Sequence, residues 1–357
     1  MGDYAFHDTV RLSYETARDW TKEIYEHCGM TPEDAYVCAD ALVDADVHGV
    51  FSHGLLRVPQ YYNRFKKGGT NPTAHPEIVH EFGATALVDG HDAMGHVVAD
   101  YAVKLAIRKA KEHGTSAVSV TGSNHMGTTS YYTRQAAAEN QICVFWTVNT
   151  ANLMAPYGGT EAQLGNNPLG IAVPREGKDP LVLDMAMSLV AKGKIEMALR
   201  THSPIPEGWA VDRDGKPTTD PEAAYWGTML PFGGYKGYAL CLMNAMMSAI
   251  LPGAHFGPTM TNLIDQPEIP NCTGHLFQCI DIRAISDPDA FKRRVEEAVA
   301  YIKNGRKAEG VSEILVPGER SQRVCARQMA EGIVYPAEVI EDLCTISKEV
   351  GAGIPQL

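Results

Sequence analysis

Residues 115–127 read Thr-Ser-Ala-Val-Ser-Val-Thr-Gly-Ser-Asn-His-Met-Gly, and this stretch decides the class of fold. Thr115–Val120 predicts a β-strand, because valine and threonine favour extended backbone. A glycine-bounded loop, Gly122–Gly127, follows it and carries His125. A strand that ends in a histidine-bearing loop and leads to a helix is a common way to present a catalytic group at a sheet edge.

Helices and strands alternate around this stretch, and the pattern predicts an α/β fold. Thr31-Pro32 supplies a hydroxyl cap and a first-turn proline for a helix that Gly49 ends. No G-x-G-x-x-G follows a strand, so the Rossmann fingerprint is missing. Helices are expected over residues 10–47, 98–113, 131–139, 233–247, 288–304 and 336–349, and one more passes through residues 191–194. Strands are expected over residues 115–120, 142–148, 181–184, 276–281 and 314–316. A hairpin is expected near residues 209–215.

The length and composition describe an ordinary globular protein with two interlocked domains. The chain has 357 residues, of which 45% are hydrophobic and 21% charged. We place a cofactor-binding domain at residues 141–254, and a helical N-terminal and catalytic-histidine part at 1–140, completed by 255–357. The net charge of −12 disfavours nucleic-acid and anionic-membrane partners, which need a basic face. The longest apolar run, 238–251, is too short for a bilayer span.

Cysteine usage and the N-terminus both point to the cytoplasm. The eight cysteines form no C-x-x-C pair, and a chain of this size needs no disulfide staples. Cys143 and Cys241 lie in apolar stretches, which indicates buried free thiols. Residues 1–8 lack the basic start and apolar run of a signal peptide. We therefore expect a cytoplasmic protein.

A second histidine-bearing segment, residues 46–57, reads Asp-Val-His-Gly-Val-Phe-Ser-His-Gly-Leu-Leu-Arg. An imidazole that titrates near neutral pH and a fixed guanidinium suit acid–base chemistry beside the charged end of a small carboxylate. The spacing of four places His53 and Arg57 on one side of a helical turn. His48 is expected to lie at the end of the preceding helix, outside catalysis.

A metal site is the alternative use of these histidines. His48, His53 and His125, with Asp44 or Asp46, offer nitrogen and oxygen ligands for zinc in a hydrolase or lyase. The H-E-x-x-H and H-x-H spacings are missing, and the helix-end residues are expected to project away from His53. We predict no metal.

Eight short motifs follow one another along the chain. They are Ser52-His53-Gly54 with Arg57 and Tyr61, Lys67-Gly68-Gly69-Thr70-Asn71, Ser123-Asn124-His125-x-Gly127, Pro156-Tyr157-Gly158-Gly159, Gly165-Asn166-Asn167-Pro168-Leu169, Leu183-Asp184-Met185-Ala186, Gly193-Lys194 and Lys236-Gly237-Tyr238. This series resembles the type-2, non-Rossmann malate/L-lactate dehydrogenase family, which includes ureidoglycolate and sulfolactate dehydrogenases, over about residues 10–350. The resemblance implies a mixed sheet with a helical N-terminal region, a homodimer, and metal-independent interconversion of a 2-hydroxy acid and its 2-oxo partner with NAD or NADP.

The resemblance also implies roles for individual residues. His125 matches the proton-transferring histidine, and His53 stands beside the substrate and is the donor in some members. Arg57 matches the clamp of the substrate carboxylate. The same site includes Ser52, Tyr61 and Asn167, and cofactor contacts are implied for Thr150, Asn167, Asp184, Met185, Ala186, Lys236, Gly237, Pro317, Gly318 and Glu319.

Three of these cofactor positions have a second interpretation. Glu319 would accept from a ribose 2′-hydroxyl and repel a 2′-phosphate, which favours NAD. Arg320 and Arg323 would instead receive the phosphate of NADP, so NAD is the preferred prediction and NADP the alternative. Asp184 is either a cofactor ligand or a helix cap. Lys236 either binds a phosphate or is solvated.

The predicted substrate is a small anionic 2-hydroxy acid such as malate. The alternatives are a cyclic imino acid, a ureidoglycolate-type substrate, the metal-dependent hydrolase or lyase, and a non-catalytic binding protein that keeps the pocket. Thr128 and Thr129 depart from the apolar residues expected in malate-type members. The candidate pocket wall comprises Met126, Thr128, Thr129, Thr147 and Asn149.

Overall fold

The computed structural model describes residues 8–356, so residues 1–7, where no signal peptide is predicted, lie outside the described part. Its centre is a seven-stranded mixed sheet in the order β2-β3-β4-β10-β5-β6-β7. Two-stranded ribbons, β1-β11 and β8-β9, lie apart from it. The strands are β1 (Thr9–Leu12), β2 (Glu77–Phe82), β3 (Thr85–Asp89), β4 (Thr115–Ser123), β5 (Gln141–Thr147), β6 (Leu169–Val173), β7 (Leu181–Met185), β8 (Ala210–Val211), β9 (Thr228–Met229), β10 (Thr273–Asp281) and β11 (Ile333–Pro336).

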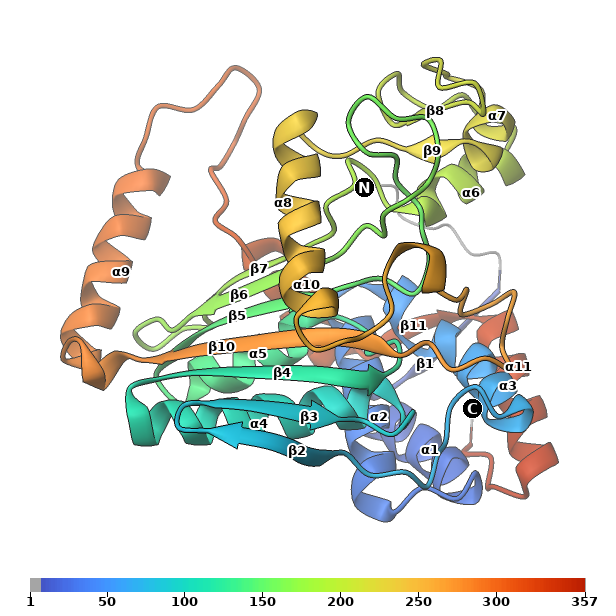
Figure 1. The fold of residues 1–357 in the computed structure, drawn as a ribbon, viewed down its shortest axis with the longest axis horizontal. Coiled ribbons are helices and arrows are strands. Elements are labelled where there is room, and N and C mark those ends of the chain that lie inside the picture. The colour runs from blue at the N-terminus through green and yellow to red at the C-terminus, as the bar shows by residue number, and fades with distance from the viewer. Residues whose placement is uncertain (1–7, 357) are drawn as a thin grey trace.

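The helices cover both faces of this sheet (Figure 1). They are α1 (Tyr14–His27), α2 (Pro32–Val47), α3 (Val58–Lys67), α4 (Gly95–His113), α5 (Thr129–Ala138), α6 (Lys192–Arg200), α7 (Pro221–Trp226), α8 (Tyr235–Ala245), α9 (Pro288–Lys303), α10 (Glu319–Glu331) and α11 (Ala337–Val350). Short 3₁₀ turns, η1 (Phe51–His53) and η2 (Leu55–Arg57), join α2 to α3. None of the helices within residues 8–356 combines the length and apolarity that a membrane span requires.

The middle of the sheet is the strand pair that places His125. β10 runs antiparallel to both β4 and β5, whereas β3 runs parallel to β4. Alternate residues of β4, including Val118 and Val120, are buried against α4. The same apolar cluster takes in Phe145 of β5 and Phe277 of β10, whose rings stack with centroids 3.9 Å apart. The loop after β4 therefore starts from a rigid, well-packed strand.

The predicted elements of the α/β core are confirmed, and two segments differ. Residues 314–316 are not a strand, because the Val316 N–H bonds the Glu319 side chain at 3.1 Å and prepares the start of α10. The region predicted as helix from residue 10 begins with β1, which pairs with β11 across more than 320 positions of sequence. Such a distant partner leaves no periodic signal in a four-residue strand.

The predicted hairpin near 209–215 is right in its turn and wrong in its partner. The Asp212 N–H bonds the Lys216 carbonyl at 2.9 Å, and Val211 forms a single bridge to Pro217. The regular ladder of β8, however, pairs with β9. The central sheet takes strands from both predicted domains, residues 141–254 and residues 1–140 with 255–357. The division into two domains therefore stays a prediction.

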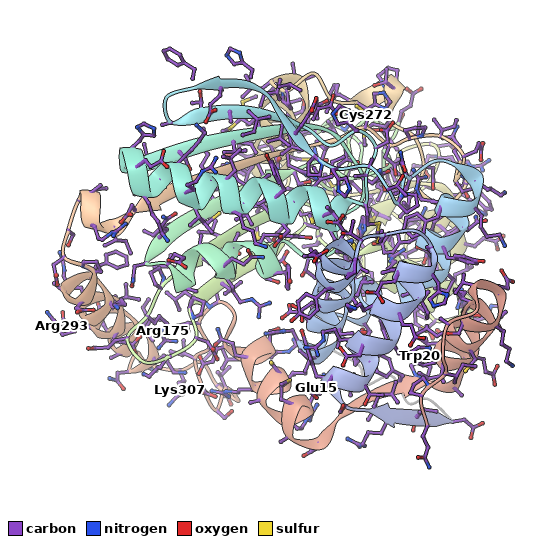
Figure 2. The ribbon with its side chains drawn as sticks, turned by 90° about the horizontal axis from the view of Figure 1, so that it is seen from below. Glu15, Trp20, Arg175, Cys272, Arg293 and Lys307 are labelled. Carbon is purple, nitrogen blue, oxygen red and sulfur yellow. The ribbon has the colours of Figure 1, made fainter. Side chains whose placement is uncertain are left out.

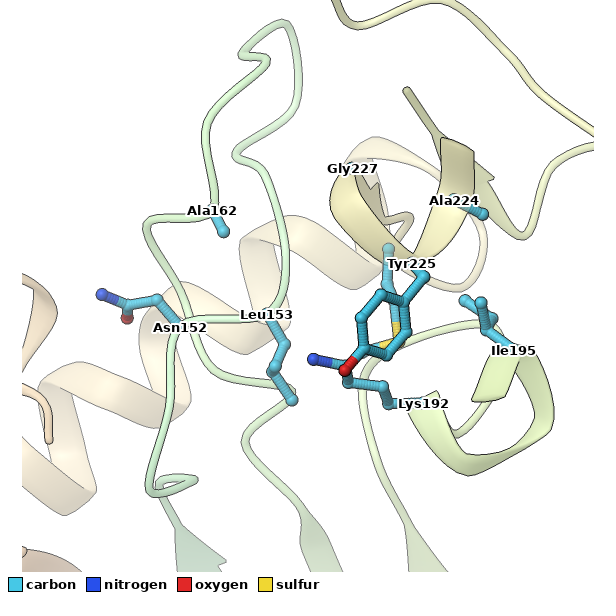
Figure 3. A pocket seen from close by; sticks show the side chains of 9 residues that line it. Asn152, Leu153, Ala162, Lys192, Ile195, Ala224, Tyr225 and Gly227 are labelled. Atoms are coloured by element: carbon cyan, nitrogen blue, oxygen red, sulfur yellow. The ribbon is translucent and has the colours of Figure 1, made fainter. Parts of the chain in front are cut away.

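Two features lie away from the histidines. A small pocket opens between α6, α7 and residues 152–162 (Figure 3), where the Lys192 ammonium lies 5.1 Å from the Tyr225 ring centre. On another side, Arg175 reaches α9 (Figure 2) and bonds Glu296 at 2.5 and 3.0 Å. Neither feature includes a predicted catalytic residue.

Candidate active site

The structure brings His53 and His125 together from separate parts of the chain. Their rings stack with centroids 5.6 Å apart and planes inclined by 26°. His53 ends η1, and His125 lies in the loop that follows β4. Both rings are half-buried. The predicted pairing of the two histidine segments is thus realised in the fold.

Arg57 lies beside this pair at the start of α3. Its Nε donates to the Ser52 carbonyl at 2.6 Å, and its Nη1 donates to the Gln60 side chain at 2.7 Å. Ser52 also lies close to the pair of His53 and His125, with its Oγ 2.9 Å from His53 Nδ1. The guanidinium is held by one backbone and one side-chain acceptor, an arrangement that directs it without neutralising its charge.

Burial and charge keep both imidazoles neutral at pH 7. Burial lowers the pKa of His53 to about 4, and the Arg57 charge lowers it further while Asp184 opposes the shift. Burial also holds the pKa of His125 well below its usual range, with His53 and Arg57 adding to the effect. An anionic substrate next to Arg57 would offset part of this repulsion.

His48 is at the end of α2, as predicted, and does not join the pair. Its Nδ1 lies 2.8 Å from the Asp44 carbonyl, and Arg134 of α5 donates to its Nε2 at 2.5 Å. Residues 8–356 contain no group of three or more His, Cys, Asp or Glu side chains placed to hold a metal ion. The ligand set considered for zinc is therefore divided between two places.

Asp46 is one of the residues considered as a zinc ligand. In the structure it instead supports the loop that carries His53. Its buried carboxylate accepts from the Leu55 N–H at 2.9 Å. Gly54 passes so close that an added Cβ would lie 1.8 Å from this carboxylate. The Ser-His-Gly motif is thus explained in part by packing.

Arg64, which the sequence interpretation missed, ties α3 to the His125 loop. It is fully buried and donates from Nη2 to the Asn124 side chain at 3.1 Å and to the Gly69 carbonyl at 2.5 Å. Asn124 in turn donates to the carbonyls of Asp92 and Ala93 at 3.0 and 2.9 Å. A buried arginine in an amphipathic helix resembles a surface cation in sequence, so only its place on the apolar face of α3 hinted at this role.

The glycines around this network allow close backbone contacts. A Cβ on Gly95 would lie 2.2 Å from the Asn124 carbonyl, and one on Gly69 would lie 2.1 Å from the Pro267 carbonyl. The first contact packs the start of α4 directly under the His125 loop. The second accounts for the glycine in the Lys-Gly-Gly-Thr-Asn motif.

The predicted cofactor residues of β7 and α10 lie side by side. The Val182 N–H bonds the Pro317 carbonyl at 3.2 Å, and a Cβ on Gly318 would lie 3.1 Å from Val182. Asp184 accepts from the Ser130 N–H at 2.9 Å and so caps α5 from the neighbouring strand. Met185 and Ala186, at the end of β7, continue the same edge.

Glu319 has a different setting from the one predicted. Its carboxylate bonds the Lys303 ammonium, the Val316 N–H at 3.1 Å and the Arg323 guanidinium at 2.7 Å. These partners lower the pKa of Glu319, the hydrogen bond from Lys303 contributing most. The carboxylate thus already has two cations beside it.

The remaining predicted cofactor residues lie in two places. Asn167 accepts from the Asn149 N–H at 3.3 Å and donates to the Cys241 carbonyl at 3.3 Å, and Thr150 is buried beside it. Lys236 and Gly237 open α8, after the left-handed residues Gly233 and Gly234. Lys236 is exposed, and no side chain caps this helix. Uncapped N–H groups next to an ammonium suit an anionic phosphate.

Comparisons with known proteins identify the family of the chain. The family model described as malate/L-lactate dehydrogenase matches residues 12–344. The chain belongs to this family. Its fold is that of the type-2 enzymes, as the resemblance implied: it superposes on the solved sulfolactate dehydrogenase of Methanocaldococcus jannaschii with a TM-score of 0.91 and 40% identity, covering 96% of this chain and 98% of that one.

The curated relatives are named dehydrogenases of 2-hydroxy acids. The L-sulfolactate dehydrogenase of Methanocaldococcus jannaschii is 42% identical over 96% of this chain and 98% of its own. The (2R)-3-sulfolactate dehydrogenase (NADP(+)) of Chromohalobacter salexigens is 35% identical over 93% of this chain and 96% of its own. The ureidoglycolate dehydrogenase (NAD(+)) of Escherichia coli O157:H7 is 32% identical over 94% of each chain. The predicted enzyme class and its nicotinamide cofactor are confirmed at this level.

Proposed function

We propose that this dehydrogenase interconverts a small 2-hydroxy acid bearing a second anionic group, such as malate or its sulfonate analogue, and the matching 2-oxo acid. The observation that carries the proposal is the stacked pair His53 and His125 with the Arg57 guanidinium beside it. Two neutral imidazoles beside a fixed cation match a substrate with a carboxylate next to a reactive oxygen.

Each side chain has one task in the proposed reaction. Arg57 binds the C1 carboxylate and orients the substrate. The carboxylate offsets the Arg57 charge, so it raises the pKa of His125 in the complex relative to the free enzyme. His125 then gives a proton to the C2 oxygen in the reductive direction and takes it back in the oxidative one. His53 lies on the other side of the reacting oxygen and holds it by a hydrogen bond.

The residues at two helix starts and one strand end fit a nicotinamide cofactor. The α8 start with Lys236 offers N–H groups and a charge to a diphosphate, while the segments that carry Asp184–Ala186 and Pro317–Glu319 pack together at Val182. Thr150 and Asn167 complete the proposed set. When bound, the cofactor supplies or accepts the hydride, and the chain positions the substrate and moves the proton.

We also propose a cytoplasmic homodimer. All eight cysteines are free, and Cys143 and Cys241 are buried, which suits a reducing compartment. Exposed apolar side chains on and after α8, such as Met243, Ile250 and Leu251, support association with a second copy. Sedimentation at micromolar concentration tests this part, and a monomer would contradict it.

A substrate panel tests the proposed function. NADH and NADPH oxidation is followed at 340 nm with oxaloacetate, sulfopyruvate, pyruvate, a cyclic imino acid and oxalurate. We expect turnover with oxaloacetate or sulfopyruvate to exceed that with pyruvate by at least about tenfold in kcat/KM, since a second anionic group adds binding energy. Turnover with the imino acid alone, or with none of the five, would contradict the proposal.

The Arg57→Ala variant tests the carboxylate clamp. Loss of a charge-assisted hydrogen bond is expected to raise KM for the 2-oxo acid by about tenfold to a hundredfold. Cofactor binding should stay as in the wild type. The neighbouring variant Gln60→Ala removes only one support of Arg57 and should change KM by less than the Arg57 variant does. An unchanged KM in Arg57→Ala excludes the clamp.

A further inference from the structure

Tyr61 makes a contact with His125 that a substrate ligand does not need. Its Oη lies 2.6 Å from His125 Nδ1, and the Gly127 N–H donates to the same nitrogen at 3.4 Å. Within residues 8–356, no other group bonds this imidazole. Nδ1 is therefore occupied by the protein, and Nε2 is the nitrogen left to meet a substrate.

The tyrosine is held so that its hydroxyl stays at Nδ1. Tyr61 is only 2% exposed, on the buried face of α3 that also carries Val58 and Arg64. The His96 ring packs against it edge-on, with centroids 5.6 Å apart and planes inclined by 81°. Burial raises the pKa of Tyr61, so the group remains a phenol at every working pH. A phenol can both donate and accept a hydrogen bond.

The Tyr61 hydroxyl and the Gly127 N–H differ in which protonation states of Nδ1 they can hydrogen-bond. In the neutral ring with its proton on Nε2, both the Tyr61 hydroxyl and the Gly127 N–H can donate to Nδ1. In the imidazolium, Nδ1 carries a proton and needs an acceptor. A backbone N–H cannot accept, whereas the Tyr61 oxygen can after a rotation of its O–H bond. Only Tyr61 therefore suits both protonation states of His125.

We propose that Tyr61 is a positioning residue for His125 and not a ligand of the substrate. Its hydroxyl accepts from the Nδ1–H of the imidazolium and of the imidazole that remains after Nε2 has given up its proton, so Nδ1 stays protonated and Nε2 exchanges the proton. In the reductive direction, hydride from the reduced nicotinamide cofactor reaches C2, and the Nε2 proton passes to the C2 oxygen. An imidazolium and an alkoxide thus become an imidazole and an alcohol, and the remaining proton stays on Nδ1, held by Tyr61. This inference rests on the proposed function.

The variant Tyr61→Phe removes the hydroxyl and keeps the ring. A hydrogen bond to a charged group is worth more than one between neutral groups, so the imidazolium loses more than the imidazole does. In reduction, the descending limb of log kcat against pH should move to lower pH by about half to one unit. At a fixed pH on that limb, kcat should fall about threefold to tenfold, with KM for the 2-oxo acid and the cofactor Kd within about twofold.

Two other buried tyrosines provide matched controls. Tyr132 donates to the Met126 carbonyl at 2.7 Å in the same loop, without touching His125. Tyr25 lies in the same apolar cluster as Tyr61, and its hydroxyl has no hydrogen-bond partner in the described part of the chain. Tyr132→Phe and Tyr25→Phe should leave the pH of the descending limb unmoved, whatever they do to stability.

A spectroscopic measurement separates this inference from the proposed function. Nitrogen-15 spectra of imidazole-labelled wild type, with the His125 signals assigned by their loss in His125→Asn, should show the proton on Nδ1 at pH 7. In Tyr61→Phe the same signals should titrate at lower pH or shift toward a tautomer mixture.

Different experimental outcomes reject the inference about Tyr61 and the proposed function. An unmoved pH limb with a tenfold higher KM in Tyr61→Phe makes Tyr61 a substrate ligand and overturns the inference. A neutral wild-type ring with its proton on Nε2 overturns it as well. Failure of the wild type on all 2-oxo acids rejects the proposed function instead, and the spectra still decide the tautomer.

Discussion

The histidine pair and the predicted cofactor positions are supported in different ways. His53 and His125 rest on buried polar side chains: Asp46 bonds the Leu55 N–H next to the His53 loop, and Arg64 bonds Asn124 next to His125. The cofactor positions on β7, α8 and α10 range from the buried Gly237 to the exposed Asp184 and Lys236, and no side chain caps the start of α8. Acid–base groups need fixed geometry before the substrate arrives, whereas a charged cofactor can complete its own site.

This difference predicts that single changes cost most at the histidine pair and least at the cofactor position Glu319. The largest effect is expected for His125→Asn. Removing the group that moves the proton should lower kcat by about a hundredfold to ten-thousandfold, since general acid–base catalysis contributes this much. Stopped-flow and NADH fluorescence measure turnover and cofactor binding separately, and binding should persist.

The third histidine of the region is the control for that variant. His48 bonds Asp44 and Arg134 and is turned away from the pair. His48→Asn should therefore keep kcat within about threefold, because it removes no group that touches the substrate. Equal losses of kcat in His48→Asn and His125→Asn would place His48 in the active site, together with His53 and His125.

The second largest effect concerns the support of the pair. In Arg64→Met, the buried Gly69 carbonyl and Asn124 side chain lose their donor, and so does the part-buried Ile269 carbonyl. Leaving buried acceptors unpaired should reduce the free energy of unfolding by about 3 kcal/mol, measured by denaturant titration. Lys66→Met, on the exposed side of the same helix, should produce no measurable change. Equal stability of the two variants would show that the buried network carries no energy.

The predictable part of this molecule is the part with local signals. The β4 strand and its loop alternate in burial, and Thr31, Pro32 and Gly49 mark their helix directly, so these elements could be read from sequence. β1 and β11 were missed because their pairing depends on residues far apart. The ion pairs of Glu319 could not be predicted, because Lys303 meets it only in three dimensions and the α10 helix that brings Arg323 beside it was not predicted. Its contact with the cofactor stays a prediction.

The site shows the same division. Motif order identified His53, Arg57 and His125, because these residues lie in short segments with distinctive composition. It did not identify Arg64 or Asp46, whose roles come from being buried. A charged side chain carries no mark of burial in a single sequence, and the contact geometry that forces it inside involves several elements.

A further prediction concerns acid stability of the buried region. Burial lowers the pKa of His96 to about 3, and both of its ring nitrogens are buried without a partner in the described part of the chain. The folded state then binds one proton fewer than the unfolded state between about pH 6.5 and 3. Stability contributed by this group is complete above pH 6.5 and falls by about 1.4 kcal/mol per pH unit below it.

His96→Phe removes this titration and forfeits no hydrogen bond. The slope of unfolding free energy against pH, measured in urea from pH 6.5 to 4.5, should decrease by about 1.4 kcal/mol per unit. A slope identical to the wild type in His96→Phe would mean that the buried ring is protonated in the folded protein.

The smallest effect is expected for Glu319→Gln, at the start of α10. If its charge selected NAD by repelling a 2′-phosphate, its loss would raise the kcat/KM for NADPH by roughly tenfold or more relative to NADH. The carboxylate is already engaged by Lys303 and Arg323, so little of its charge remains for a phosphate. We therefore expect the NADH-to-NADPH ratio of kcat/KM to change by less than about threefold. The start of α10 should instead loosen, because the Val316 N–H loses part of its acceptor. Amide hydrogen exchange at residues 316–322 measures that loosening, and a changed cofactor ratio without it would show that the Glu319 charge selects the cofactor.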